Sequence, residues 1–440
     1  MKRFLIKIGI VILICMAVVI VINKRVTISC PNVEVFTAST TSPLVYEPVN
    51  IEVKVVPQEK QRIKSWNIIT KEGEWGEVNT VDFADVGDNY IKIEVEWEYQ
   101  DKDGNWVGGD SNLVTGTKEI PIQVYADIYI SSGDNQRVVK DKEAEPLEVY
   151  VCDYYFDGVS GVKIDFSGPV KIASVTSDEF GYASTELKTD TAGKYEITAS
   201  GDDILGSVTF DEIVFEVNIS ISPTTIAPLG TTNLTITVTA GTVNPMSGWD
   251  VSLSAEGVAN SGGHFHNENR PHGTPRPNRG TTDINGVVTA FYQSTEVCGK
   301  DRIIATIEGY EFTAEVNVSV GNLIALSAGT GYTLVGQTTT HPDNHYGTNT
   351  TNNALINIAN DFRREYPNGP NLLYNDMSLE QGGLFDINAN WQEPHKSHRY
   401  GANCDFNFGT LTQEQLDKLI DIIDDYGERL DEGNHWHLTF

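Results

Sequence analysis

Cysteine is scarce in this sequence, with five residues among 440. Cys15 lies in an apolar run near the N-terminus, and Cys30, Cys152, Cys298 and Cys404 are far apart from one another. This wide spacing excludes both a dense disulfide framework and a CxxC metal knuckle. We therefore expect hydrophobic cores, and not covalent links, to hold the domains together.

Basic residues are also scarce, because 31 Lys and Arg stand against 61 Asp and Glu and give a formal net charge of −30. Proteins that follow a nucleic-acid backbone neutralise its phosphates with clustered Lys and Arg, so this composition argues against a nucleic-acid partner. Typical domain sizes divide a chain of 440 residues into roughly three or four domains. Each of them is long enough to bury a sizeable core.

An apolar run at residues 4–22, interrupted only by Lys7, follows two basic residues and is long enough to cross a bilayer. We expect residues 1–30 to be a signal peptide or a membrane anchor, which places the rest of the chain in the cell envelope, anchored or secreted. The only small-x-small cleavage site, at 27–29, lies beyond further basic residues, so an uncleaved anchor is favoured. A lipidated Cys30 is the alternative, but its surroundings favour an unmodified thiol.

Helical periodicity is absent from residues 31 to about 320. Short β-branched segments there alternate apolar and polar residues and are broken by Gly, Asp, Asn and Pro, as in 49–57 and 89–99. This pattern predicts antiparallel sandwiches with one solvated face per sheet. The length suits three immunoglobulin-like modules of roughly 95 residues, and nothing in their sequences identifies a partner. We expect the modules at 31–125, 126–219 and 220–321.

The third module carries the clearest signature. Its segments ISISPTTIAPLGTTNLTITVTA (219–240), GTTDINGVVTAFYQS (280–294) and DRIIATIEGYEFTAEVNVSVG (301–321) resemble bacterial immunoglobulin-like domains of the invasin/intimin type. In those domains a T-D-x-x-G-x-x turn links two late strands. A weaker form of the same pattern occurs in the second module at 176–199. The resemblance makes a surface adhesin or spacer protein a reasonable hypothesis.

Helical periodicity begins only after the third module. Apolar residues recur with helical spacing over 355–366. A second helix is predicted to begin at Thr412, whose hydroxyl caps the first turn while Gln415 completes a capping box. We expect Gly427 to end that helix in the left-handed conformation. With strand-like segments between and around the helices, 322–440 should form a small α+β domain. The strand-like segments are 371–376, 383–388, 402–408 and 435–440.

The nine histidines are unevenly placed, with none before residue 264 and six at 341–437. His435 and His437 flank Trp436 in a strand-like segment, so both imidazoles point to one face while the indole points into the core. By itself an H-x-H pair is as often surface decoration as a functional site. Its weight here comes from a second motif earlier in the same domain.

That second motif is His398 followed seven positions later by Asp405. Neutral imidazole and carboxylate are ligands that suit Zn²⁺, and three protein ligands leave a fourth position open, as in catalytic zinc sites. His398, Asp405 and His437 make such a set. Cys404 alternates to the opposite face from Asp405 and is expected to be a small buried hydrophobe.

The run YNDMSLEQGGLFDINANWQEPHKSHRYGANCDF (374–406), followed by HWH, resembles penicillin-insensitive murein endopeptidases and, more broadly, the LAS-type zinc peptidases. These families share an H-x6-D element and a later H-x-H on one compact domain. The resemblance covers most of 322–440. It implies a zinc peptidase fold in which His398, Asp405 and His437 hold the metal.

The same resemblance implies roles for three further residues. His435 corresponds to a histidine that contacts the substrate or the developing oxyanion, and His395 corresponds to an additional histidine of the cleft. Glu432 corresponds to the general base of many relatives. Murein endopeptidases tend to have His at that position, which leaves Asp431 as a second candidate for the base.

The remaining histidines are expected in solvated loops. His341 and His345 lie in a turn-rich stretch, where a place in the cleft is the alternative to solvent exposure. The loop at 262–280 holds three more among Gly, Pro and Asn, with a metal or ligand site as the less favoured interpretation.

Three functional hypotheses follow. The first is a cell-envelope zinc metallopeptidase that hydrolyses peptide bonds of peptidoglycan, as an endopeptidase or D,D-carboxypeptidase. The second is a surface adhesin or spacer whose C-terminal zinc domain is inactive, since a bound metal can also serve only to stabilise a small domain. The third is a peptidase that processes a peptide outside the cell wall, because fold resemblance does not fix the substrate.

Overall fold

The computed structural model describes residues 31–109, 115–116, 118–242, 244–266, 269–392 and 397–440. It divides into two compact units, Met1–Val214 and Phe215–Phe440. The predicted N-terminal signal or anchor lies outside the described residues. Among the residues described, no helix is both long and apolar enough to span a membrane.

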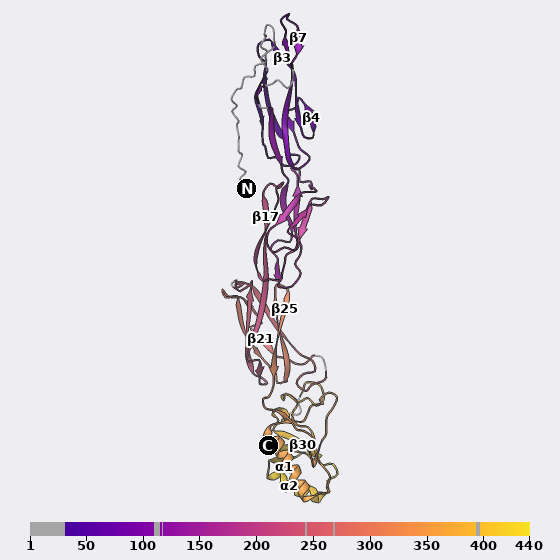
Figure 1. The fold of residues 1–440 in the computed structure, drawn as a ribbon. Coiled ribbons are helices and arrows are strands. Elements are labelled where there is room, and N and C mark those ends of the chain that lie inside the picture. Colours follow the sequence, from indigo (N-terminus) through magenta and orange to yellow (C-terminus); the bar gives the residue numbers. More distant parts are fainter. Residues whose placement is uncertain (1–30, 110–114, 117, 243, 267–268, 393–396) are drawn as a thin grey trace. The chain divides into compact units, whose positions relative to one another are not determined.

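The first unit begins with a sandwich of two sheets (Figure 1, indigo to purple). One sheet has the order β5-β2-β1-β8, and the other has the order β4-β3-β6-β7 with β9 also paired to β6. Ile91, Ile93 and Val95 alternate along β6 and are at most 1% exposed, which is the period of two expected of a strand with one buried face. The strands are β1 (Asn32–Ala38), β2 (Val49–Val56), β3 (Gln61–Thr70), β4 (Gly73–Gly76), β5 (Thr80–Val81), β6 (Gly87–Gln100), β7 (Trp106–Gly108), β8 (Thr115–Gly116) and β9 (Glu119–Val124).

A second sandwich completes the first unit. Strands β10, β12 and β15 form one sheet, and β14, β13, β16 and the start of β17 form the other. Val149, Ile164, Ile197 and Phe210 are fully buried in the core of this sandwich. The strands are β10 (Asp127–Ser132), β11 (Arg137–Val139), β12 (Leu147–Cys152), β13 (Lys163–Phe166), β14 (Ser174–Thr176), β15 (Tyr182–Thr185), β16 (Gly193–Ser200) and β17 (Ser207–Ser222).

The second unit opens with a third sandwich. One sheet contains the second half of β17, then β19, β23 and β21, and the other has the order β18-β25-β24-β20-β22. In β19 every second residue is buried, which confirms the alternation in the sequence. The chain is thus mostly β, with immunoglobulin-like two-sheet modules. The strands are β18 (Thr225–Ile226), β19 (Thr231–Thr239), β20 (Asp250–Gly257), β21 (Thr274–Arg276), β22 (Arg279–Thr281), β23 (Val287–Gln293), β24 (Gly299–Ile307) and β25 (Tyr310–Val318).

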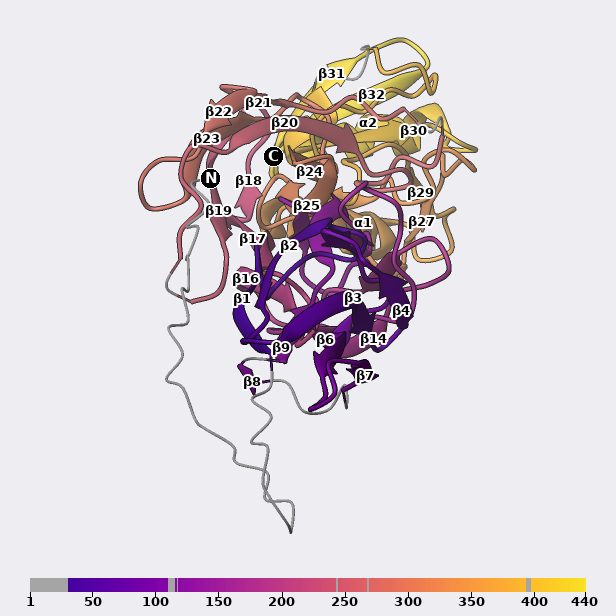
Figure 2. The ribbon, with the colours of Figure 1, turned by 90° about the horizontal axis from the view of Figure 1, so that it is seen from above.

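The C-terminal domain of the second unit has a sheet of order β27-β29-β30-β32-β31 and two helices (Figure 2, orange to yellow). Leu355 and Phe362 of α1 and Leu419 of α2 pack with Cys404 and Trp436 in one buried core. The elements are β26 (Ile324–Ala325), β27 (Tyr332–Leu334), β28 (Tyr346–Gly347), α1 (Asn349–Glu365), β29 (Leu372–Tyr374), the 3-10 helix η1 (Ser397–Tyr400), β30 (Asn403–Asn407), α2 (Gln413–Asp424), β31 (Glu428–Asp431) and β32 (His435–Thr439).

Two local expectations for this domain are wrong. Residues 383–388 are not a strand, because the backbone turns there and Ala389 donates to the carbonyl of Asp386 at 2.7 Å. Gly427 is not in the left-handed region, since it is missing from the positive-φ glycines of the described residues. It is needed because a Cβ at this position would lie 2.4 Å from the carbonyl oxygen of Thr439.

Candidate metal site in the C-terminal domain

Two adjacent antiparallel strands place two of the predicted ligands face to face. Asp405 of β30 stands directly opposite His437 of β32, and side chains at such a pair share one face of the sheet. Their neighbours Cys404 and Trp436 alternate to the other face and are buried in the core. The local alternation of the sequence therefore suffices to bring the carboxylate and the imidazole together.

The third predicted ligand, His398, comes from η1 and is 1% exposed. Its Nε2 lies 3.2 Å from Oδ1 of Asp405, and Nδ1 of His437 lies 2.8 Å from the same oxygen. The rings of His398 and His437 meet edge to face, with centroids 4.9 Å apart. One donor atom from each of the three residues falls within 4.8 Å of the others, so the structure brings the whole predicted set together.

This set fits a zinc ion. Bonds of about 2.0 Å with tetrahedral angles separate neighbouring donor atoms by about 3.3 Å, close to the distances between the Asp405 oxygen and the two nitrogens. Burial raises the pKa of the Asp405 carboxyl, but His398 and His437 outweigh burial and hold that pKa below its usual range. The side-chain amide of Asn403 lies 3.0 Å from Nε2 of His437 and fixes the orientation of the ring.

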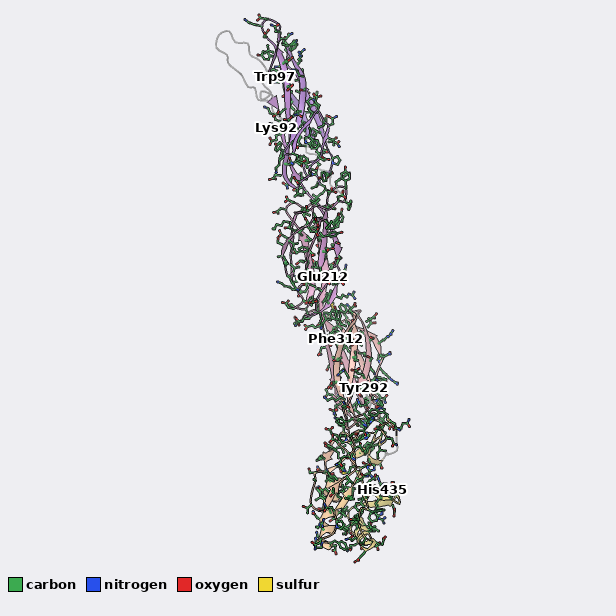
Figure 3. All side chains as sticks on the ribbon, turned by 90° about the vertical axis from the view of Figure 1, so that its right-hand side faces the viewer. Lys92, Trp97, Glu212, Tyr292, Phe312 and His435 are labelled. Atoms are coloured by element: carbon green, nitrogen blue, oxygen red, sulfur yellow. The ribbon has the colours of Figure 1, made fainter. Side chains whose placement is uncertain are left out.

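Two further predicted residues lie at the rim of this cluster. The Nε2 atom of His435 is 3.6 Å from Oδ2 of Asp405 and 3.0 Å from Oε2 of Glu432. The side chain of His435 (labelled in Figure 3) is 19% exposed and that of Glu432 is 43% exposed, so both side chains are partly open to solvent. The carboxylate of Asp431 instead accepts a hydrogen bond from the backbone of Gly433 at 2.8 Å. His395 lies outside the described residues.

The expectation of solvated loops for the other histidines is wrong at four positions. His264, His341 and His345 are at most 6% exposed, and the His266 side chain is also 6% exposed. His345 contacts the carbonyl oxygen of Tyr374 at 3.2 Å. The other three gather around Asp386 and form a second group of metal-binding character. Sequence reasoning missed Asp386, although it lies within the run 374–406, because it reaches the histidines only through tertiary packing.

No family model matches the sequence, and no curated protein matches it either. Among solved structures, the D0-D1 domain of intimin is 17% identical, over 44% of this chain and 96% of that chain, with a TM-score of 0.20. The Escherichia coli adhesin FdeC is 11% identical, over 66% and 96%, with a TM-score of 0.30. Invasin, a bacterial integrin-binding protein, is 11% identical, over 84% and 75%, with a TM-score of 0.25.

These likenesses cover between 44% and 84% of this chain. Since every TM-score is 0.30 or lower, no functional conclusion follows from them.

Proposed function

We propose that the C-terminal domain is a zinc-dependent peptidase site facing the cell envelope. The observation that carries the proposal is the convergence of His398, Asp405 and His437 within 4.8 Å of one another, next to a carboxylate that solvent can reach. Three protein donors leave a coordination position for a reactant, as catalytic zinc sites require. The substrate class, peptides of peptidoglycan, rests on the sequence resemblance to murein endopeptidases.

His398, Asp405 and His437 would hold a Zn²⁺ ion, which would lower the pKa of a bound water and polarise a scissile carbonyl. Glu432 accepts a proton from the water that attacks the carbonyl carbon, and it then delivers this proton to the amine as the C–N bond breaks. His435, whose Nε2 lies 3.0 Å from Oε2 of Glu432, is proposed on the resemblance to donate a hydrogen bond to the oxygen that gains negative charge. His395 is proposed for a similar role on the resemblance alone.

The test uses the full chain, kept in mild detergent because of its apolar residues 4–22. We expect zinc in the purified protein and release of peptides from isolated peptidoglycan, followed by mass spectrometry. The double variant H398A/D405A should lose this activity, while Glu428→Gln, an exposed acid on the neighbouring strand β31, should retain it. Normal activity in the double variant would sink the proposal.

A second candidate is a surface adhesin or spacer in which the sandwiches bind a partner. It is motivated by the length of the chain given over to tandem two-sheet modules, strands β1–β25. The adhesins named above belong to this class, although their TM-scores give them no weight here. This candidate predicts that chelation leaves partner binding intact and that neither peptidoglycan nor a peptide panel is cleaved. Cleavage of a non-wall peptide alone would instead support a processing peptidase.

A further inference from the structure

A second buried cluster lies where the loop between β20 and β21 of the third sandwich meets the C-terminal domain. His264 and His266 come from that loop, and His341 and Asp386 come from the segments that flank α1 and β29. The side chains of the four residues are between 0% and 6% exposed. All of them belong to the second compact unit. Three histidines and one aspartate therefore meet away from solvent.

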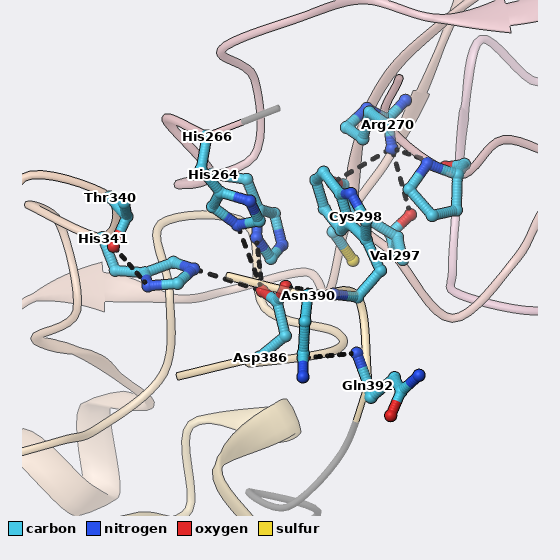
Figure 4. A network of polar contacts seen from close by, with 12 residues as sticks. His264, His266, Arg270, Val297, Cys298, Thr340, His341, Asp386, Asn390 and Gln392 are labelled. Atoms are coloured by element: carbon cyan, nitrogen blue, oxygen red, sulfur yellow. Dashed lines mark hydrogen bonds and ion pairs between the residues drawn. The ribbon is translucent and has the colours of Figure 1, made fainter. Parts of the chain in front are cut away.

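Three imidazoles point to one carboxylate oxygen in this cluster (Figure 4). Oδ1 of Asp386 lies 3.1 Å from Nδ1 of His264, 3.3 Å from Nε2 of His266 and 3.2 Å from Nε2 of His341. Neither ring nitrogen of His264 or of His266 has a partner with hydrogen-bond geometry. Buried polar atoms normally find such partners. The ring nitrogens of His264 and His266 approach Oδ1 of Asp386 without forming hydrogen bonds to it. This geometry suggests that a further atom belongs between the nitrogens and the oxygen.

We propose that His264, His266, His341 and Asp386 bind a second metal ion, a divalent ion of the zinc class, in a closed site with four protein ligands. One donor atom from each residue falls within 4.8 Å of the others, and imidazole with carboxylate is a donor set for zinc. Four buried ligands leave no position for a substrate, which is the character of a structural site. This second site is separate from the proposed peptidase site and does not depend on it.

Backbone and ring contacts around the cluster orient its ligands. The backbone N–H of Trp391 donates to Oδ2 of Asp386 at 2.6 Å, which leaves Oδ1 to face the histidines. The Trp391 ring packs on His264 and His266, with centroids 4.9 and 4.5 Å away. Such outer contacts fix the orientation of metal ligands in known sites.

The loop that carries His264 and His266 is held in place by the sandwich. Arg270 is 2% exposed, pairs with the buried Asp301 of β24, and donates to the carbonyl oxygens of Val297 and Cys298 at 3.4 and 3.3 Å. The loop also approaches the C-terminal domain closely, because a Cβ on Gly263 would lie 3.0 Å from Cβ of Leu379. The two histidines are thus positioned before any metal binds.

An ion in this site would fasten the third sandwich to the C-terminal domain. The two parts already meet through the backbone, since the N–H of Leu384 donates to the carbonyl of Glu296 at 2.9 Å and that of Phe265 donates to Thr340 at 2.8 Å. The ring of Phe385 packs against two histidines. Its centroid lies 5.3 Å from the ring centroid of His341 in this cluster and 6.4 Å from that of His398 in the peptidase site. A metal bound here would therefore also hold in place Phe385, which packs against His398 of the peptidase site.

The experiment measures metal content of the full chain, loaded with zinc and dialysed. We expect about two zinc ions per chain in the wild type and about one in H264Q/H341Q. The control variant H272Q removes the third histidine of the same loop, which is exposed and contacts the carbonyl of Gly273, and should retain about two. The same number of ions in H264Q/H341Q as in the wild type would overturn the proposal, whereas one ion fewer in H264Q/H341Q supports it even if the peptidase site binds none.

A second variant keeps the test decisive if H264Q/H341Q does not fold. H398Q/D405N removes two donors of the peptidase site and leaves the second cluster intact. Loaded with Co²⁺, it should bind about one ion and show the intense visible absorption of four-coordinate cobalt. Absence of bound cobalt in a folded H398Q/D405N protein would contradict the second site. Loss of peptide cleavage alone bears on the peptidase proposal and leaves the second site standing.

Discussion

Glu432 and Asp431 are adjacent acids whose surroundings differ. Glu432 lies 3.0 Å from His435, whereas the Asp431 carboxylate accepts from the backbone N–H of Gly433 and stabilises a turn. Because a general base contributes about a hundredfold to ten-thousandfold, Glu432→Gln should lower kcat/KM for a peptidoglycan peptide by such a factor. The zinc content should stay unchanged, since Glu432 is not a proposed ligand.

Asp431→Asn is the matched control for Glu432→Gln, because it removes the same charge one residue away. We expect it to lower kcat/KM by less than about tenfold. The reverse order of the two variants would identify Asp431 as the base. Kinetics and metal analysis on the same preparations separate a lost base from a lost metal.

The ligands of the first candidate metal site could be predicted from the sequence, whereas those of the second cluster could not. Asp405 and His437 face each other because period-two alternation and one strand pairing suffice. The second cluster escaped prediction because its residues come from separate segments. The turn-forming composition around His264 and His266 suggested an exposed loop. The burial of that loop depends instead on a residue distant in sequence, Asp301, which pairs with Arg270.

At the level of secondary structure, the sequence predicts the start of α2 in the most detail, through its capping box. The hydroxyl of Thr412 accepts from the N–H of Gln415 at 3.3 Å, and the side chain of Gln415 accepts from the N–H of Thr412 at 2.9 Å. Loss of a cap costs about 1 kcal/mol. Thr412→Ala should therefore lower the free energy of unfolding of the second unit by about that amount.

Urea denaturation followed by circular dichroism measures this change. Thr410→Ala, two residues earlier and exposed before the helix begins, is the matched control and should stay within about 0.5 kcal/mol of the wild type. Equal effects of the two substitutions would show that the cap contributes nothing beyond ordinary surface effects.

Other elements show where local patterns fail. The apolar spacing at 355–366 matches α1, which spans Asn349–Glu365 and ends at the C-cap Tyr366, because one face of the helix is buried in the core. Residues 383–388 alternate like a strand, yet Leu384 bonds to Glu296 of the sandwich and Asp386 turns toward the second cluster. Alternation specifies which side chains are buried, but a sheet partner must also be available.

At the scale of the whole molecule, the two compact units are expected to respond to different solution conditions. Both candidate metal sites lie in the second unit, whereas the first unit contains a buried acid, Glu212 of β17, that is 1% exposed (Figure 3). Glu212 accepts from the backbone N–H of Gln136 at 3.0 Å. Burial nevertheless raises its pKa from 4.5 to about 7.

This shift fixes the sign of a pH dependence. Between pH 4.5 and about 7 the folded state keeps a proton on Glu212 that the unfolded state releases. The contribution of Glu212 to stability is therefore fully present below pH 4.5 and is lost as the pH rises through about 7. By linkage, the loss is on the order of 3 kcal/mol.

Glu212→Gln removes the titrating group while keeping its shape and an oxygen for Gln136. The free energy of unfolding of the first unit, measured by urea denaturation, should fall between pH 4.5 and 7 by about 3 kcal/mol more in the wild type than in E212Q. Glu196→Gln, an exposed position on the paired strand β16, should retain the wild-type dependence. Parallel pH profiles for the wild type and E212Q would show that Glu212 is ionised in the folded protein throughout this range, with its charge stabilised by the backbone donors that surround it.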